Sequence, residues 1–91
     1  MPSYLVETYL ARGDAGRRTA CEQRARSAAE EQTRNGTCVR FDGAIHIPED
    51  EICFYVFDAG SGRDAALVAQ RAGLEPFRVV EAVSSREENH S

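Results

Sequence analysis

The chain has 91 residues and a net charge of −4, from 15 acidic and 11 basic side chains. This length suits one domain, and the negative charge argues against a phosphate-binding surface, so nucleic acid is excluded as a first expectation. No segment approaches the roughly 18 apolar residues of a membrane helix, and no basic stretch followed by an apolar one opens the chain. We therefore expect a cytosolic protein with no membrane partner, whose three cysteines stay reduced as free thiols.

The first half of the chain predicts a strand, a helix and a second strand. Residues 4–10 are rich in aromatic and β-branched side chains and end at the turn-forming residues 12–16. Residues 17–32 are rich in Ala, Glu, Gln and Arg, with small residues recurring on one face at helical spacing, so we expect a helix that lies close to a sheet. Asn35 and Gly36 end this helix, and residues 38–47 alternate as a strand does.

The second half repeats the order strand, helix, strand. A polar turn over residues 48–51 leads into a third strand over 52–58. A helix is predicted over about 63–72 and a fourth strand over 77–83, and we expect the polar tail 84–91 to be disordered.

This βαββαβ order is typical of the ferredoxin-like fold, an α+β architecture with a four-stranded antiparallel sheet and both helices on one face. We expect residues 1–83 to form one such domain. The second sheet face is then left open, and a domain this small tends to bury such a face against a partner. The default expectation is a homodimer whose two open faces close into an α+β barrel.

The predicted hairpin register sorts the side chains of the second and third strands between the two faces. It makes four apolar residues face the helices, namely Ile45, Ile47, Ile52 and Phe54. On the open face it sets three pairs about 5 Å apart: His46 with Cys53, Ala44 with Tyr55, and Asp42 with Phe57. If Tyr4, Val6 and Leu10 are core residues, the first strand adds Glu7 and Tyr9 to the open face, and the fourth strand adds Glu81.

His46 and Cys53 form a candidate metal-binding pair, because imidazole and thiolate together suit Zn²⁺, Ni²⁺ or copper. Two ligands do not make a site, so further donors would have to come from Glu7, Glu81, Asp42, Tyr55 or a second copy of the chain. The plain alternative is a hydrogen-bonded histidine beside an inert, half-buried cysteine.

Residues 60–65, Gly-Ser-Gly-Arg-Asp-Ala, match the spacing of a dinucleotide-binding loop. A βαββαβ domain lacks the further strand-helix units of a nucleotide domain, so we expect only a turn with Ser61 or Asp64 near the helix cap.

Three segments carry a family resemblance: MPSYLVE at the start, EICFYVFDA in the third strand, and AALVAQRAGLEPFRVVEAV from residue 65 to 83. They resemble a family of small bacterial ferredoxin-like proteins known as nickel-binding-protein-like, otherwise of unknown function. The resemblance implies a small dimeric protein and a nickel ion as a possible ligand. Family members often carry a histidine in the second helix, where this chain has Val68 and Ala69. The resemblance and the hairpin register agree on Cys53 and Tyr55.

Three functions follow as hypotheses. The first is a dimeric binding protein that holds a transition metal such as nickel, or a small ligand, on its open face. The second is a dimeric α+β barrel enzyme, of cyclase or monooxygenase type, with His46 or Glu7 as acid or base for a small organic substrate. The third is a structural or regulatory dimer without a ligand.

Overall fold

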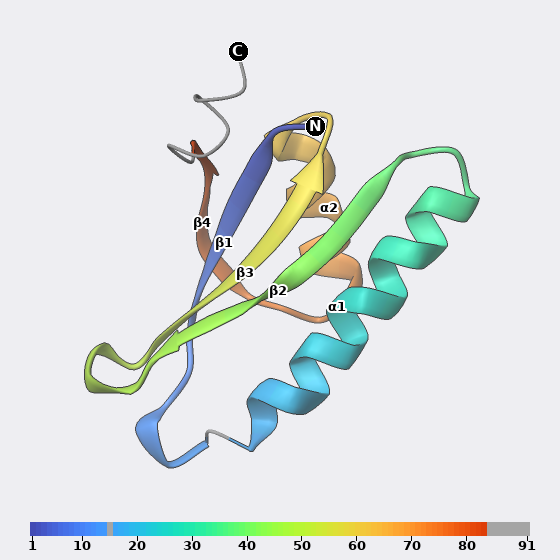
Figure 1. Cartoon of the computed structure of the whole chain (residues 1–91). Helices are drawn as coiled ribbons and strands as arrows, with labels where there is room; N and C mark the ends of the chain where they lie inside the picture. The colour runs from blue at the N-terminus through green and yellow to red at the C-terminus, as the bar shows by residue number, and fades with distance from the viewer. Residues whose placement is uncertain (15, 84–91) are drawn as a thin grey trace.

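Four strands form one antiparallel sheet in the computed structural model, which describes residues 1–14 and 16–83 (Figure 1). The elements are β1 (Ser3–Tyr9), α1 (Arg17–Arg34), β2 (Val39–Ile47), β3 (Ile52–Ala59), α2 (Gly62–Arg71) and β4 (Pro76–Ala82), with 3-10 turns at Arg12–Asp14 and Pro48–Asp50. The strand order is β2-β3-β1-β4, with every neighbouring pair antiparallel. The predicted ferredoxin-like α+β fold is therefore confirmed, while the expectation for the tail 84–91 lies outside the described residues.

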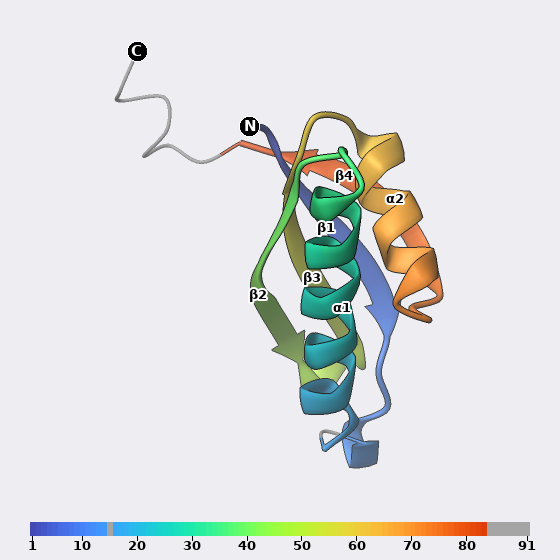
Figure 2. The ribbon, with the colours of Figure 1, turned by 90° about the vertical axis from the view of Figure 1, so that its right-hand side faces the viewer.

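Both helices cover the same face of the sheet (Figure 2). α1 lies close to the strands because its inward positions are small, with Ala25, Ala28 and Ala29 all buried. α2 begins as the sequence predicts: the Ser61 hydroxyl accepts a hydrogen bond from the Asp64 backbone N–H at 3.2 Å. Within the part of the chain described, neither helix is long and apolar enough to cross a membrane.

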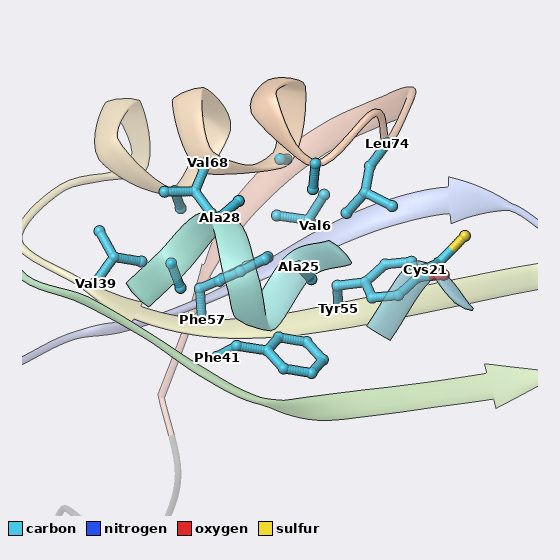
Figure 3. Close-up of a cluster of buried hydrophobic side chains, with 14 of the residues drawn as sticks. Val6, Cys21, Ala25, Ala28, Val39, Phe41, Tyr55, Phe57, Val68 and Leu74 are labelled. Carbon is cyan, nitrogen blue, oxygen red and sulfur yellow. The ribbon is translucent and has the colours of Figure 1, made fainter. Parts of the chain in front are cut away.

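The core lies between the helices and the sheet, and its largest fully buried side chains come from the middle of β3 (Figure 3). Tyr55 and Phe57 are buried there, and the ring of Phe41 on β2 lies 5.3 Å from that of Phe57, centroid to centroid. Burying one such aromatic side chain contributes about 1.5 to 3 kcal/mol to folding. These rings therefore fix β3 and β2 beneath α1.

A bulge in β2 overturns the predicted assignment of faces. Phe41 pairs with Phe57, but Gly43 pairs with Val56, so one extra residue, Asp42, lies in β2 between these pairs. Gly43 adopts a φ of +145°, which a residue with a side chain rarely adopts. Because side chains alternate with a period of two, one inserted residue moves every later side chain of the strand to the other face.

The predicted pairs between β2 and β3 are correct beyond the bulge, but they lie on the opposite face. Ile47 pairs with Ile52, Ile45 with Phe54, His46 with Cys53, and Ala44 with Tyr55, as expected. The prediction that the Ile45 and Phe54 side chains face the helices is wrong, since Cys53 and Tyr55 are the buried members of β3. The predicted pairing of Asp42 with Phe57 is also wrong, because Asp42 is the bulged residue.

The open face of the sheet is consequently apolar. Side chains from all four strands lie on it, partly or largely exposed: Leu5, Ile45, Ile47, Ile52, Phe54, Val56 and Val80. Charges also lie on this face. The Arg78 Nε donates to a Glu7 carboxylate oxygen at 2.8 Å, and nearer the other end of the sheet Arg40 forms ion pairs with Asp42 and Asp58. We call these seven apolar residues the open-face patch.

Replacing Gly43 by alanine tests the bulge. A Cβ at this position meets no atom within 4 Å, so the cost comes from the backbone conformation alone. We expect Gly43→Ala to lower the free energy of unfolding by about 1 to 3 kcal/mol in urea titrations. The control is Gly16→Ala, where φ is −65° and a Cβ also meets nothing. Equal stability of the two variants would contradict the role given to the bulge.

Candidate functional site

A pocket of about 290 Å³ opens where the end of β1, the start of α1 and the connection from α2 to β4 come together. Tyr55 and Cys21 line it from the core side, and Leu10 and Leu74 supply apolar walls. Figure 3 shows the Tyr55 ring directed along the sheet towards Cys21. We call this cavity the Tyr55 pocket.

Charged side chains line the outer part of the Tyr55 pocket. Arg17 and Arg24 come from α1, Asp14 from the turn before it, and Glu75 from the connection to β4. The Arg24 Nε donates to the Ala72 carbonyl at 2.9 Å, and its Nη2 lies 3.3 Å from the Cys21 Sγ. Arg24 thus ties α1 to the end of α2 and places a cation beside the thiol.

The Tyr55 hydroxyl and the Cys53 thiol are held in their neutral forms. Burial raises the pKa of Tyr55 well above its ordinary value, and its hydrogen bond to Cys21 raises it further. Burial also raises the pKa of the Cys53 thiol. These groups can therefore donate and accept hydrogen bonds at neutral pH, but neither is a ready base or nucleophile.

The structure brings His46 and Cys53 together, but not on the open face. They are cross-strand partners on the helix side of β2 and β3, and Cys53 is completely buried. The Nε2 of His46 is buried and has no hydrogen-bond partner among the residues that the structure describes. Among residues 1–14 and 16–83 there is no group of three or more His, Cys, Asp or Glu side chains that could hold a metal ion.

The remaining predicted contacts of the open face are divided between the two sides of the sheet. Glu7 lies on the open face as expected, paired with Arg78. Tyr55 is wrong as an open-face residue, because its side chain is 1% exposed beneath the helices. Glu81 is also wrong, since it pairs with Tyr4, whose ring lies against Gly62 of α2.

Asp42 belongs to a carboxylate cluster that sequence reasoning missed. Its Oδ1 accepts from the Arg40 Nε at 2.9 Å, and another nitrogen of the same guanidinium bonds to Asp58. The Ser3 hydroxyl donates to the other oxygen of Asp58 at 2.7 Å. Asp42 is the bulged residue of β2, and Gly43 inside a strand pattern was the available sign of the bulge.

The two carboxyl groups have pKa values shifted in opposite directions. Burial and the hydrogen bond with Asp58 raise the pKa of Asp42. Burial opposes ionisation of Asp58 too, but hydrogen bonds from Ser3, Asp42 and Arg40 outweigh it, so the pKa of Asp58 lies below its ordinary value. The surroundings thus favour the ionised form of Asp58 and disfavour the ionised form of Asp42.

No family model matches the chain, and no curated protein matches it significantly. The structure is similar to a crystal structure of the protein SCO4226 from Streptomyces coelicolor A3(2), with a TM-score of 0.75 and 14% sequence identity. The match covers 90% of this chain and 98% of that one. At this level of identity the similarity supports the fold alone.

The pH dependence of stability in an Asp58 variant tests the carboxylate cluster. Since its folded pKa is lowered, the stability that Asp58 contributes is present above its unfolded pKa and is lost as pH falls through the folded pKa. We expect Asp58→Asn to cost about 1 to 3 kcal/mol near neutral pH, with the cost shrinking below about pH 4, in urea titrations at several pH values.

Asp42→Asn is the matched variant. The folded pKa of Asp42 is raised, so its contribution is present below the unfolded pKa and lost as pH rises through the folded one. An asparagine keeps an acceptor for Arg40 and a donor for Asp58, and should therefore cost less than Asp58→Asn near neutral pH. The same cost for both variants at every pH would contradict the opposite pKa shifts of the two carboxyl groups.

Proposed function

We propose that the protein is a small self-associating ligand-binding protein of the cytosol, in which each copy holds a small molecule in the Tyr55 pocket and the copies meet through the open-face patch. The observation that carries the proposal is the pocket itself: a cavity that reaches from a charged mouth to the buried Tyr55 and Cys21 side chains.

The size of the Tyr55 pocket limits the ligand. A volume of about 290 Å³ is at the lower end of what small-molecule sites have, so a nucleotide or a long lipid is too large. Leu10, Leu74 and Phe77 offer apolar contact, while the Tyr55 hydroxyl at the inner end offers a neutral hydrogen-bonding group. A compact organic molecule with an apolar body and one polar end fits these walls.

Binding has more support than catalysis. The enzyme hypothesis assigned acid or base chemistry to His46 or Glu7, but Glu7 is held by Arg78 on the far side of the sheet. His46 does not line the Tyr55 pocket, and the Tyr55 group that does is kept neutral by burial. A binding role needs no charge change in the pocket, whereas general acid–base catalysis does.

Self-association has support from the open-face patch. Its exposed members include Ile45, at 53% exposure, and Ile47, at 37%. A second copy is the partner we favour, because the Glu7–Arg78 pair carries both charges on one face and is self-complementary under a two-fold axis. Covering this face would remove apolar surface from water at about 25 cal/mol per Å² before the costs of association are subtracted.

Placing a charge in the centre of the patch tests the dimer. Phe54 lies between Glu7 on β1 and Ile45 on β2. We expect wild-type protein to have twice the chain mass in light scattering, and Phe54→Glu to have the mass of one chain, because an unpaired buried carboxylate opposes association. The matched control is Leu67→Glu on the exposed side of α2, which should stay dimeric. A monomeric wild type would end this part of the proposal.

Filling the Tyr55 pocket tests ligand binding. Native mass spectrometry of tag-free protein, produced in medium supplemented with nickel and zinc, reports subunit number and bound mass together. We expect a small organic mass on the wild type and none on Ala11→Trp, since Ala11 lines the pocket and the indole would occupy it. The control is Ala20→Trp, on the exposed surface of α1 outside the pocket. A dimer that never carries a bound mass would contradict ligand binding and support a structural or regulatory dimer without a ligand.

A transition metal such as nickel is the second candidate ligand, in keeping with the family resemblance. The observation that favours it is the unpartnered Nε2 of His46 directly across from Cys53. Other donors would be needed, and Cys21 and Glu22 of α1 are the acidic or thiol groups that act on Cys53. A metal mass that is present on the wild type and lost with His46→Ala, Cys53→Ala would support this candidate over the organic ligand.

A further inference from the structure

The groove between α1 and the edge strand β2 is a second cavity, of about 460 Å³, on the other side of α1 from the Tyr55 pocket. Val39 and Phe41 of β2 line it together with Arg26, Ala29, Thr33 and Arg34 of α1. In Figure 1, β2 forms the edge of the sheet next to α1, and no other strand of the described residues lies beyond it. We call this cavity the β2 groove.

The backbone of β2 presents free hydrogen-bonding groups along this edge. In β3 the Ala59 N–H donates to Pro2, and the Glu51 carbonyl just before β3 accepts from Leu10, so the odd-numbered residues of β3 direct their backbone groups towards β1. Their partners on β2 therefore direct both N–H and C=O away from the sheet. Those partners are Val39, Phe41, Ala44 and His46.

Among the described residues, hydrogen-bond partners are found for the outward groups of the first of these four residues alone. The Thr33 hydroxyl donates to the Val39 carbonyl at 2.8 Å and accepts from the Val39 N–H at 3.1 Å. Within residues 1–14 and 16–83, no hydrogen bond is found for the outward groups of Phe41, Ala44 and His46. Such an edge is a template on which an extended segment can pair.

The charges beside the edge favour an acidic segment. Arg26 lies over the Phe41 ring, 5.4 Å from its centroid, and neither Arg26 nor Arg34 forms an ion pair with another described residue. Of the described residues that line the groove, Glu30 alone is acidic. Two copies pairing through this edge would bring their arginines together, and that like-charge contact opposes a homodimer here. This basic stretch lies on a chain whose net charge is −4.

We propose that the β2 groove binds an extended acidic peptide segment of another protein, which adds to the sheet as a fifth strand beside β2. Its backbone pairs with the outward groups of Phe41, Ala44 and His46, and its carboxylates meet Arg26 and Arg34. The site is separate from the Tyr55 pocket and from the open-face patch, so this proposal does not depend on the proposed function.

Fluorescence polarisation with two labelled peptides tests the proposal on the full chain. The probes are a decapeptide of alternating Glu and Val and one of alternating Lys and Val. We expect saturable binding of the Glu peptide, at least about tenfold tighter than the Lys peptide, because strand pairing is common to both and charge is not. The double variant Arg26→Glu, Arg34→Glu should lower the affinity for the Glu peptide by at least about tenfold. The control double variant Arg63→Glu, Arg71→Glu on α2 should lower this affinity by less than about twofold.

A proline in the edge separates strand addition from simple charge attraction. Ala44→Pro removes an outward N–H without breaking a hydrogen bond to β3. This variant should lower the affinity for the Glu peptide by at least about tenfold. Amide exchange on the wild type gives the same information without a variant: the Phe41, Ala44 and His46 N–H groups should exchange more slowly with the Glu peptide bound. Equal binding of both peptides, or unchanged exchange at these three amides, would overturn the proposal.

Discussion

One inserted residue in β2 decides which chemistry lies inside this protein and which lies outside. Asp42 is bulged between the pairs Phe41–Phe57 and Gly43–Val56, and the φ of +145° at Gly43 makes the insertion possible. Phe41 therefore packs on the core side before the bulge, and Ala44 and His46 lie on that side after it. Without the bulge, the isoleucines of β2 would face the helices and the histidine would face outward. The carboxylate cluster, the open-face patch and the position of His46 all depend on this residue.

The buried side of the sheet combines apolar packing with three groups that could in principle react. Tyr55, Cys53 and Cys21 meet beneath α1, where burial raises the pKa values of Tyr55 and Cys53. A neutral hydroxyl costs less to bury than a phenolate, and in this position it still has hydrogen-bonding capacity to offer a ligand. The same burial that stabilises the core thus makes the inner end of the pocket suited to recognition and poorly suited to proton transfer.

Sequence reasoning succeeds here where the signal is local or periodic. It fails where one inserted residue changes the alternation of side chains along a strand. The small residues of α1, the Ser61 cap and the turn at residues 48–51 all specify local structure, and the order of elements leaves few topologies open. The hairpin register was predictable because turn length and isoleucine pairing agree on it. The face on which each β2 side chain lies was not predictable in the same way, because the alternation of side chains between the two faces is broken next to Gly43. The Tyr55 pocket joins residues from β1, α1, β3 and the connection to β4, and no spacing in the sequence marks such a meeting point.

The open-face patch and the β2 edge impose different requirements on a partner, and this keeps their roles distinct. The patch offers apolar side chains beside the Glu7–Arg78 ion pair, in which the two charges balance each other, so a partner is recognised by shape and burial. The edge offers backbone groups flanked by arginines, so a partner is recognised by extended conformation and negative charge. A surface of the first kind suits a copy of the same chain, which repeats both members of the ion pair. A surface of the second kind disfavours such a copy, because arginines outnumber the acidic residue Glu30 in the groove and a second copy would bring more arginines to it. The two proposals therefore place partners of different chemistry on different parts of one small sheet, one on its face and one along its edge.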